Sequence, residues 1–434
     1  MSPLVLGFSG FAAIIVLIIL RVPIGLALAG VAFIGIVMLL GLDIALSMLR
    51  ILPFDFVATW ELSAIPMFLL MGSIAHRSGM TAHLFEAARV WFGRLPGGLA
   101  VATNFACAGF ASASGSSLAT TMAIGRITIP EMLRHKYDPG LATGVVASAG
   151  TLGILIPPSI IMVIYGIFVE VSVAKLFIAG IIPGLLTAGI YALQIMLRCK
   201  LNPKLAPMQD EPATWGERWA SLREVWPLPL LILGVIGGIY TGFATPTEAG
   251  ALGATLAVII GVALRKLTLA AFREACREAI LSTASIFFVA VGAVLLTRFM
   301  AFSGVPIFLG DAVRAFGIDP LVLILTTGFV YLVLGCFLDP LGMMLLTLPV
   351  FLPMFQAANI DLIWFGILLV KFVEIGLMTP PVGLNVYGVK VMMPEIPLGV
   401  IFRGTGWFLM SEAVILFLLI AFPQISLYLP SLMD

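Results

Sequence analysis

Two short stretches of small and polar residues interrupt apolar runs, and each precedes a pair of prolines. The stretch ASASGSS (111–117) is followed by Ile-Pro-Pro at 156–158, and the stretch FLDPLG (337–342) is followed by Thr-Pro-Pro at 379–381. The spacing between stretch and prolines is nearly the same in both cases. The match indicates an internal repeat with a polar turn and a broken helix in each copy.

The prolines predict main-chain oxygen atoms without helical partners. Proline has no N–H, and its ring clashes with the carbonyl four residues back. Pro157 and Pro158 are therefore expected to leave the carbonyls of Gly153 and Ile154 unpaired. Inside a membrane, irregular backbone persists only where it is buried in protein or lines a watery cavity. A small hard cation would satisfy such carbonyls, and the helix N-termini at the same breaks would suit a carboxylate.

Side chains of the two polar stretches supply further oxygen atoms. The first candidate cation site combines the serines of its stretch with the nearby break: Ser112, Ser114, Ser116, Ser117, Gly150, Thr151 and Gly153. The second combines Gly335, Asp339, Gly342, Gly376 and Thr379. Three alternatives stay open. The prolines could be simple kinks, the serines could serve close helix packing, and Asp339 could cap the helix that begins at Pro340.

The composition identifies the class of protein in which these sites lie. Of the 434 residues, 61% are hydrophobic and only 10% are charged, whereas about a quarter of the residues in a soluble domain are charged. Most apolar runs approach the roughly 20 residues that cross hydrocarbon, and none alternates as barrel strands do. We therefore expect an all-α polytopic membrane protein, with runs at 4–20, 24–40, 62–75, 176–197, 228–242, 248–264, 279–297 and 400–422.

Lysine and arginine orient the chain, because short cytoplasmic loops carry an excess of both. Placing Arg21 inside predicts periplasmic N- and C-termini. The apolar run 99–129 has basic flanks on both sides, so it should enter and leave from the cytoplasmic face. The run 321–355 begins and ends on the face that is poor in basic residues. The two runs are therefore expected to be re-entrant hairpins that point in opposite directions.

The chain thus divides into two inverted repeats, each with an amphipathic arm, a re-entrant hairpin and a discontinuous helix. The first repeat covers 62–197, with its arm at 81–92, hairpin at 96–133 and broken helix at 141–168. The second covers 279–422, with its arm at 306–316, hairpin at 320–355 and broken helix at 362–391. Scaffold helices occupy 1–61 and 227–278, and a cytoplasmic linker occupies 198–226. This organisation is typical of secondary transporters.

Other interpretations have less support. An ion channel with re-entrant loops is an alternative, although filters usually form from symmetric or parallel loops. A sodium–proton exchanger shares the broken helices, but few carboxylates lie at the expected midplane. We expect no enzymatic activity, because no nucleophile–base pair or metal-ligand set is evident. Lys371 and Glu374 lie inside a predicted span. The sequence supports a structural ion pair and a functional site equally well for these two residues. Arg126 and Arg298 are better interpreted as surface anchors than as residues that bind an anion.

Five motifs occur in order along the chain: SASGSSLATTMAIG, IPEM, YDPGLATGVVASAGTLGILIPPS, LDPLGMMLLTLPVFLP and TPPVGLN. Together they resemble the large membrane subunit (M subunit) of tripartite ATP-independent periplasmic (TRAP) transporters. The resemblance implies an elevator-type ion transporter in a bacterial inner membrane that couples Na+ to uptake of an organic acid, such as a C4-dicarboxylate, a sialic acid or a keto acid. It also implies two partners, a periplasmic substrate-binding protein (P type) and a separate small four-helix membrane subunit (Q type).

The resemblance also assigns roles to residues. One sodium site would use Ser112, Ser114, Ser116, Gly150, Thr151 and Gly153. The other would use Gly335, Asp339, Gly376, Thr379 and the main-chain carbonyl of Val382. The substrate would lie between the two sites, near Ser116, Ser117, Pro157, Pro381 and Asn385.

Overall fold

The computed structural model describes residues 2–207 and 214–433, and every regular element in this part of the chain is a helix. Five of these helices are long and apolar enough to cross a membrane, or up to eight spans result if each bent helix pair counts as one. The expected all-α polytopic class is therefore confirmed. Within the predicted linker at 198–226, residues 208–213 lie outside the described part.

The first repeat contains an arm, a hairpin and an interrupted helix. Its helices are α4 (Ala64–Arg77), α5 (Met80–Phe92), α6 (Gly98–Ser114), α7 (Ser117–Arg134), α8 (Pro139–Ala149), α9 (Leu152–Leu155), α10 (Ile160–Val169) and α11 (Val173–Leu201). The hairpin α6–α7 turns at Gly115, whose φ of +59° is a left-handed conformation that glycine adopts without steric cost. Ser116 then caps α7 by accepting a hydrogen bond from the Ala119 N–H.

The second repeat has the same order of elements. Its helices are α16 (Leu269–Ser303), α17 (Val305–Phe316), α18 (Pro320–Gly335), α19 (Pro340–Ala357), α20 (Leu362–Met378), α21 (Leu384–Met392) and α22 (Leu398–Ala421). The carboxylate of Asp339 caps α19, and Pro340 takes the first helical position. A backbone N–H at this position would have no intrahelical acceptor, so proline, which lacks one, is tolerated there.

Other helices precede the repeats, connect them or follow them: α1 (Pro3–Ile19), α2 (Ile24–Leu40), α3 (Leu42–Val57), α12 (Trp215–Val225), α13 (Pro227–Ile232), α14 (Gly238–Tyr240), α15 (Pro246–Ala263) and α23 (Gln424–Leu427). The sequence analysis did not identify α3, because Asp43, Arg50 and Asp55 lower its hydropathy. Helix α3 meets the helical segment 60–77 at a bend of 56°. The 35-residue α16 also begins ten residues before the predicted span at 279.

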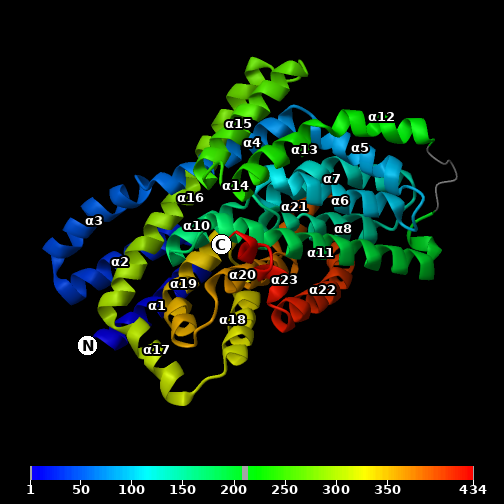
Figure 1. Ribbon diagram of the computed structural model, residues 1–434. Coiled ribbons are helices and arrows are strands. Elements are labelled where there is room, and N and C mark those ends of the chain that lie inside the picture. Colours follow the sequence, from blue (N-terminus) through cyan, green and yellow to red (C-terminus); the bar gives the residue numbers. More distant parts are fainter. Residues whose placement is uncertain (1, 208–213, 434) are drawn as a thin grey trace.

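One bundle contains the first hairpin, both broken helices and the last helix of each repeat. Helix α8 packs against α22, α7, α6 and α21, while α20 packs against α11, α22 and α18. These helices fill the centre and right of Figure 1. Where α8 crosses α22, a Cβ on Gly404 would lie 1.9 Å from the Gly140 carbonyl oxygen. Small residues at a crossing allow two helix backbones to approach closely.

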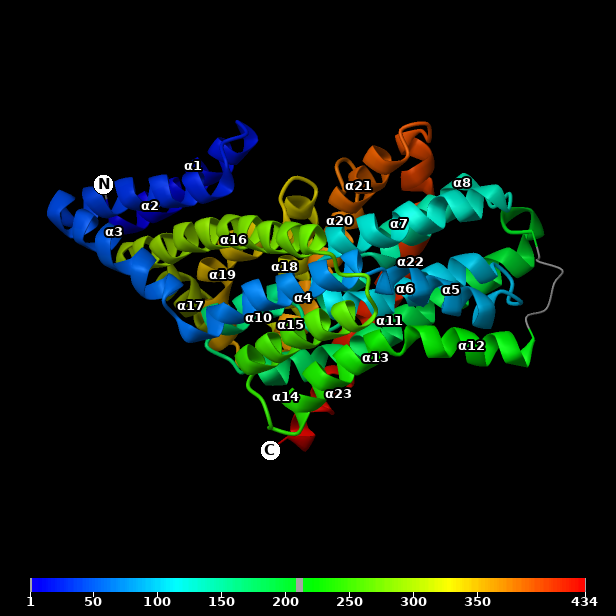
Figure 2. The ribbon, with the colours of Figure 1, turned by 90° about the horizontal axis from the view of Figure 1, so that it is seen from above.

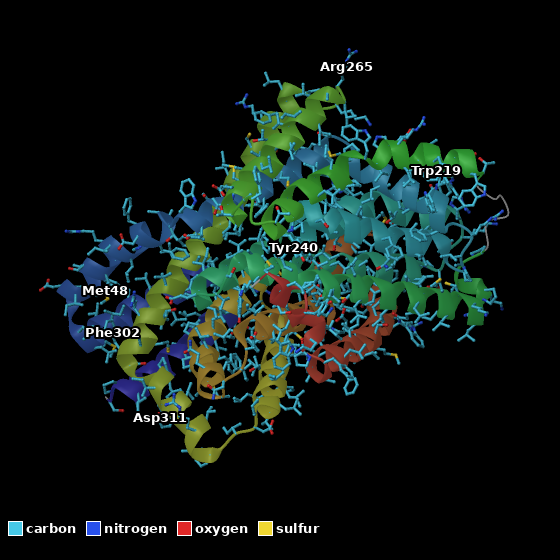
Figure 3. All side chains as sticks on the ribbon, viewed as in Figure 1. Met48, Trp219, Tyr240, Arg265, Phe302 and Asp311 are labelled. Carbon is cyan, nitrogen blue, oxygen red and sulfur yellow. The ribbon has the colours of Figure 1, made fainter. Side chains whose placement is uncertain are left out.

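A second group, which we call the scaffold, consists of α2, α4, α15 and α16. Helix α16 packs against α2 and α4, and α15 packs against α4. Figure 2 shows α16 crossing the molecule from the end that holds α1–α3 towards the end that holds α6–α8. Arg265, which follows α15, and Asp311, on α17, lie at opposite edges of the view in Figure 3. The scaffold also touches both hairpins, because α16 contacts α19 and α4 contacts α6.

Candidate functional site

A cavity of about 420 Å³ lies where the two hairpin tips meet. The first tip contributes Gly115, Ser116 and Ser117, and the second contributes Asp339 and Pro340. The second hairpin also contributes Leu341, and the broken helices and the scaffold complete the wall with Leu69, Ile154, Ile160, Ile161, Leu281, Ser282, Ser285, Ile286, Leu377, Leu384 and Asn385. In Figure 1, α18 and α19 lie below and to the left of α6 and α7. The two polar stretches thus border a single site.

Four helices begin at this cavity. Their first residues, Ser117 of α7, Ile160 of α10, Pro340 of α19 and Leu384 of α21, all line its wall. A helix N-terminus carries unpaired N–H groups and about half a positive charge. No carboxylate other than Asp339 lines the cavity among the described residues. The arrangement therefore favours an anionic ligand in the space between the tips.

Asn385 joins the second broken helix to the first hairpin. Its side chain is fully buried, and Nδ2 donates to Ser117 Oγ at 2.7 Å and to the Ala147 carbonyl at 3.0 Å. Its Oδ1 has no hydrogen-bond partner within the described part of the chain. Of the five predicted substrate residues, the cavity wall includes Ser116, Ser117 and Asn385. Neither of the two predicted prolines lines it.

The first break brings hydroxyl groups of the hairpin against the main chain. A Cβ on Gly153 would lie 2.5 Å from the Ser116 carbonyl oxygen and 2.6 Å from Thr120 Oγ1. Ser114 Oγ lies 2.6 Å from the same Thr120 Oγ1. Because Gly153 has no side chain, the backbone of the break and the oxygen atoms of the tip can share a small space. Carbonyl and hydroxyl oxygens in such a space fit a hard cation.

Two threonines of α7 belong to this break although the sequence analysis missed them. Thr121 Oγ1 is buried without a hydrogen-bond partner in the described structure, and a Cβ on Gly150 would lie 1.9 Å from it. Thr120 and Thr121 come one helical turn after Ser116 and Ser117, so they share a face with the predicted serines. This helical spacing is the signal in the sequence that could have identified both threonines. Thr151 instead donates its hydroxyl to the Ser148 carbonyl at 2.7 Å.

One prediction about the first break is wrong. The Ile154 carbonyl does not need a cation, because Ser159 Oγ donates a hydrogen bond to it at 2.6 Å. Ser159 follows the two prolines and also caps α10, so its side chain reaches back across the break. Pro157 is buried within this turn.

At the second break, two glycines bring the hairpin and the broken helix into backbone contact. A Cβ on Gly335 would lie 2.6 Å from Gly376 Cα. Thr379 Oγ1 donates to the Ile375 carbonyl at 2.6 Å. Pro381 is exposed, and Val382 lies between it and the turn at Gly383. Neither Thr379 nor Val382 borders the cavity.

Asp339 has one carboxylate oxygen in a cap and one outside it. Oδ2 accepts hydrogen bonds from the backbone N–H groups of Leu341 and Gly342 at 3.2 and 3.1 Å. The capping alternative is therefore correct. Oδ1 accepts no hydrogen bond from a described residue, so the cap leaves it available to a cation.

A second cavity, of about 380 Å³, continues from the first and shares Leu69, Ser116 and Ser282 with it. Its farther wall contains His76, Arg77, Arg126 and Glu278, among others. Arg77 Nη2 lies 3.0 Å from Glu278 Oε2. Arg126 is exposed and has no ion-pair partner among the described residues. The second cavity therefore extends from the hairpin tips to Arg126.

A buried charged cluster links three helices of the bundle. Lys371 and Glu374 on α20 and Glu412 on α22 are all fully buried. Lys371 Nζ lies 2.5 Å from Glu374 Oε2, 2.9 Å from Glu412 Oε1 and 3.3 Å from Thr187 Oγ1 on α11. The Tyr191 hydroxyl, also on α11, donates to Glu412. Ion pairs therefore link α20 to α22, and hydrogen bonds join α11 to both; Glu412 is the charged member that the sequence analysis missed.

Comparison with known proteins places the chain among transporters. Residues 11–425 match the family described as "Tripartite ATP-independent periplasmic transporter, DctM component". The C4-dicarboxylate TRAP transporter large permease protein DctM of Pseudomonas aeruginosa is 38% identical, over 86% of this chain and 86% of its own. The sialic acid TRAP transporter large permease protein SiaM of Vibrio cholerae is 33% identical over 86% and 87%. The ectoine/5-hydroxyectoine large permease protein UehC of Ruegeria pomeroyi is 32% identical over 97% and 98%.

A solved structure supports the same fold. The crystal structure of the Alcanivorax borkumensis YdaH transporter superimposes with a TM-score of 0.62, covering 89% of this chain and 90% of that one, at 16% sequence identity. The similarity therefore concerns the fold alone. The family match over residues 11–425 and the relatives at 32–38% identity confirm the resemblance seen in the motifs: the chain belongs to the DctM family, the large membrane subunits of TRAP transporters.

Proposed function

We propose that this chain forms the transport path of a sodium-coupled uptake system for an organic acid. The observation that carries the proposal is the convergence of the N-termini of α7, α10, α19 and α21 on one cavity between the hairpin tips. Such a cavity stabilises a carboxylate. The names of relatives point to the same class, because two of them carry C4-dicarboxylates and sialic acid.

The sodium ions would bind at the two breaks. At the first, the Ser116 carbonyl, the hydroxyls of Ser114 and Thr120 and the unpartnered hydroxyl of Thr121 lie against Gly150 and Gly153. At the second, the ligand would be Asp339 Oδ1, the carboxylate oxygen that does not take part in the helix cap. Bound cations would offset the negative charge of the acid, so cation and acid would favour each other's binding.

Transport would follow an elevator mechanism, in which one rigid unit moves against another. The moving unit would contain α6–α11 and α18–α22. We include α11 and α22 in this unit because α22 packs on α8 and the Lys371 cluster joins both helices to α20. Helices α1–α4, α15 and α16, with the arms α5 and α17, would stay fixed in the membrane.

Family membership supports a proposal for the partners and the location. We propose a bacterial inner membrane location with both termini periplasmic, a periplasmic binding protein that delivers the acid, and a small membrane subunit supplied by a separate chain. A relative from Oleidesulfovibrio alaskensis is named isethionate TRAP transporter permease protein DctMQ, and this chain covers 59% of its length. The remainder of that relative has room for a fused small subunit.

Uptake into proteoliposomes tests the function. The chain is reconstituted with its small subunit, and uptake of succinate, N-acetylneuraminate and pyruvate is measured with and without the binding protein under an inward sodium gradient. We expect at least one acid to enter only when sodium and the binding protein are both present. Uptake that is unchanged when potassium replaces sodium contradicts the coupling. Ion currents without acid would identify a channel, and proton release driven by sodium would identify an exchanger.

A further inference from the structure

The scaffold helix α16 forms one side of the cavity between the hairpin tips. Leu281, Ser282, Ser285 and Ile286 line this side, and Ser282 also lines the adjoining cavity. Ser282 and Ser285 are three residues apart, so both side chains lie on one helix face. Helix α16 carries none of the candidate cation ligands. A ligand held between the tips would therefore also contact a helix outside the bundle that contains the first hairpin and the breaks.

The hydroxyl groups of Ser282 and Ser285 differ from the others on the same helix. Thr283 and Thr297 donate to carbonyls four residues back at 2.7 and 2.9 Å, and Ser303 donates to the Met300 carbonyl at 2.7 Å. Hydroxyls in helices commonly make this local bond. Ser282 and Ser285 make no hydrogen bond to any described residue, and both are accessible from the cavity. Their donors and acceptors are therefore available to a ligand.

We propose that Ser282 and Ser285 bind a second polar group of the transported acid, on the side of the cavity opposite its carboxylate. This inference rests on the proposed function. The helix N-termini at Ser117 and Leu384 would hold the carboxylate, and α16 lines the same cavity with two hydroxyls. A hydroxyl can donate to or accept from a second carboxylate, a keto oxygen or an alcohol. The preferred substrates are therefore bifunctional acids, and a simple alkyl acid leaves both serines unsatisfied.

The position of the serines also limits when they act. Helix α16 packs with α2 and α4 in the scaffold, whereas Ser116 and Asn385 belong to the proposed moving unit. Movement of that unit would separate the acid from Ser282 and Ser285 while its contacts with the tips persist. The serines therefore bind the acid in the state described here, in which the cavity continues towards Arg126.

The double variant Ser282→Ala/Ser285→Ala tests the inference, with Thr283→Ala as the matched control. Thr283 lies on the same helix, but its hydroxyl bonds to the Ala279 carbonyl and does not line the cavity. Uptake is measured with the acid of the panel that enters wild-type proteoliposomes fastest, and butyrate is added as a competitor. We expect the KM for the acid to rise about tenfold in the double variant, as the loss of two hydrogen bonds predicts. At saturating acid, the sodium concentration for half-maximal uptake should stay unchanged.

The selectivity should change in parallel. In wild-type protein butyrate should compete poorly with the bifunctional acid, and in the double variant the difference should shrink. The inference is overturned if the double variant and Thr283→Ala have the same KM and the same sensitivity to butyrate. This comparison requires that the wild-type protein transports the acid. Absence of sodium-dependent uptake in the wild-type protein contradicts the proposed function instead. If the double variant does not fold, Ser285→Ala alone, whose side chain is exposed, gives the same comparison.

Discussion

Asn385 Nδ2 donates a hydrogen bond to Ser117 Oγ across the boundary between the two repeats, at 2.7 Å. The same nitrogen donates to the Ala147 carbonyl on α8 at 3.0 Å. One buried amide therefore holds the start of α21, the start of α7 and the first broken helix together at the edge of the cavity. Both α7 and α21 direct their N-termini to the proposed carboxylate site, so this contact sets their relative position.

Asn385→Ala should weaken both folding and substrate binding. The variant leaves the Ala147 carbonyl and Ser117 without the amide donor, which costs about 1–3 kcal/mol for a buried polar group. We expect a lower melting temperature in detergent and a higher KM for the acid. Asn104→Ala is the control, because Asn104 is equally buried and donates to the Ala188 carbonyl at 2.8 Å away from the cavity. It should lower the melting temperature and leave the KM unchanged; an unchanged KM in Asn385→Ala would contradict the role of this contact.

Local signals in the sequence mark where several helices begin, turn or break, although they did not reveal α3. Asp-Pro pairs mark the starts of α8, α18 and α19, and in all three the aspartate caps the helix. Gly115 and the proline pairs mark the turns and the breaks because their effect on the backbone does not depend on the rest of the fold. These signals are encoded within a few residues, so a single sequence reveals them.

Contacts between distant helices could not be predicted in this way. Glu412 reaches Lys371 only because α22 packs beside α20, and nothing near Glu412 in the sequence marks that neighbour. The position of Ser282 in the cavity wall likewise depends on how α16 crosses the hairpin tips. The local bond from Ser159 to the Ile154 carbonyl was within reach of sequence reasoning, since serine after a proline break often satisfies freed backbone groups.

Gly404→Ala should destabilise the bundle, whereas Gly406→Ala should not. A Cβ on Gly404 would lie 1.9 Å from the Gly140 carbonyl oxygen and 3.1 Å from Gly144 Cα, so α22 and α8 would have to separate. Overpacking of this kind costs about 1–3 kcal/mol. Gly406 lies on the same helix with no atom near its missing Cβ, and alanine there favours the helix by up to about 1 kcal/mol. Equal melting temperatures of the two variants in detergent would show that the crossing tolerates a methyl group.

Lys371→Met should destabilise the protein far more than the loss of an exposed ion pair. The variant leaves Glu374 and Glu412 buried without their counter-ion, and breaking a buried pair costs about 3–5 kcal/mol. Arg314→Met is the control, because Arg314 and Asp311 on α17 are both exposed and such pairs contribute about 0–1 kcal/mol. Thermal unfolding in detergent compares them. Glu374→Gln keeps the contact between Lys371 and Glu412, so its melting temperature should lie between those of the other two variants.

Asp339→Asn separates helix capping from ion binding. Asparagine caps helices about as well as aspartate, so α19 should keep its start while the site loses one negative charge. We expect a higher sodium concentration for half-maximal uptake and little change in melting temperature. Asp319→Asn is the matched control, because Asp319 also precedes a proline and caps α18 but lies outside the cavity. If Asp339→Asn and Asp319→Asn showed the same sodium dependence, Asp339 would not be a ligand of the cation.

Arg126→Ala should reduce the apparent affinity for the acid without changing the coupling ion. The guanidinium lines the cavity that continues from the hairpin tips, and no described carboxylate neutralises it. A positive charge near a cavity with low-dielectric walls raises the local concentration of an anionic substrate. We expect the KM for a carboxylate to rise about tenfold, or about 1.4 kcal/mol, and the effect to fall at high ionic strength. Arg134→Ala is the control, because Arg134 lies on the same helix α7 but pairs with Glu131 and lines neither of the two cavities. Equal KM values for the two variants would contradict a role of Arg126 in attracting the acid and would support its interpretation as a surface anchor.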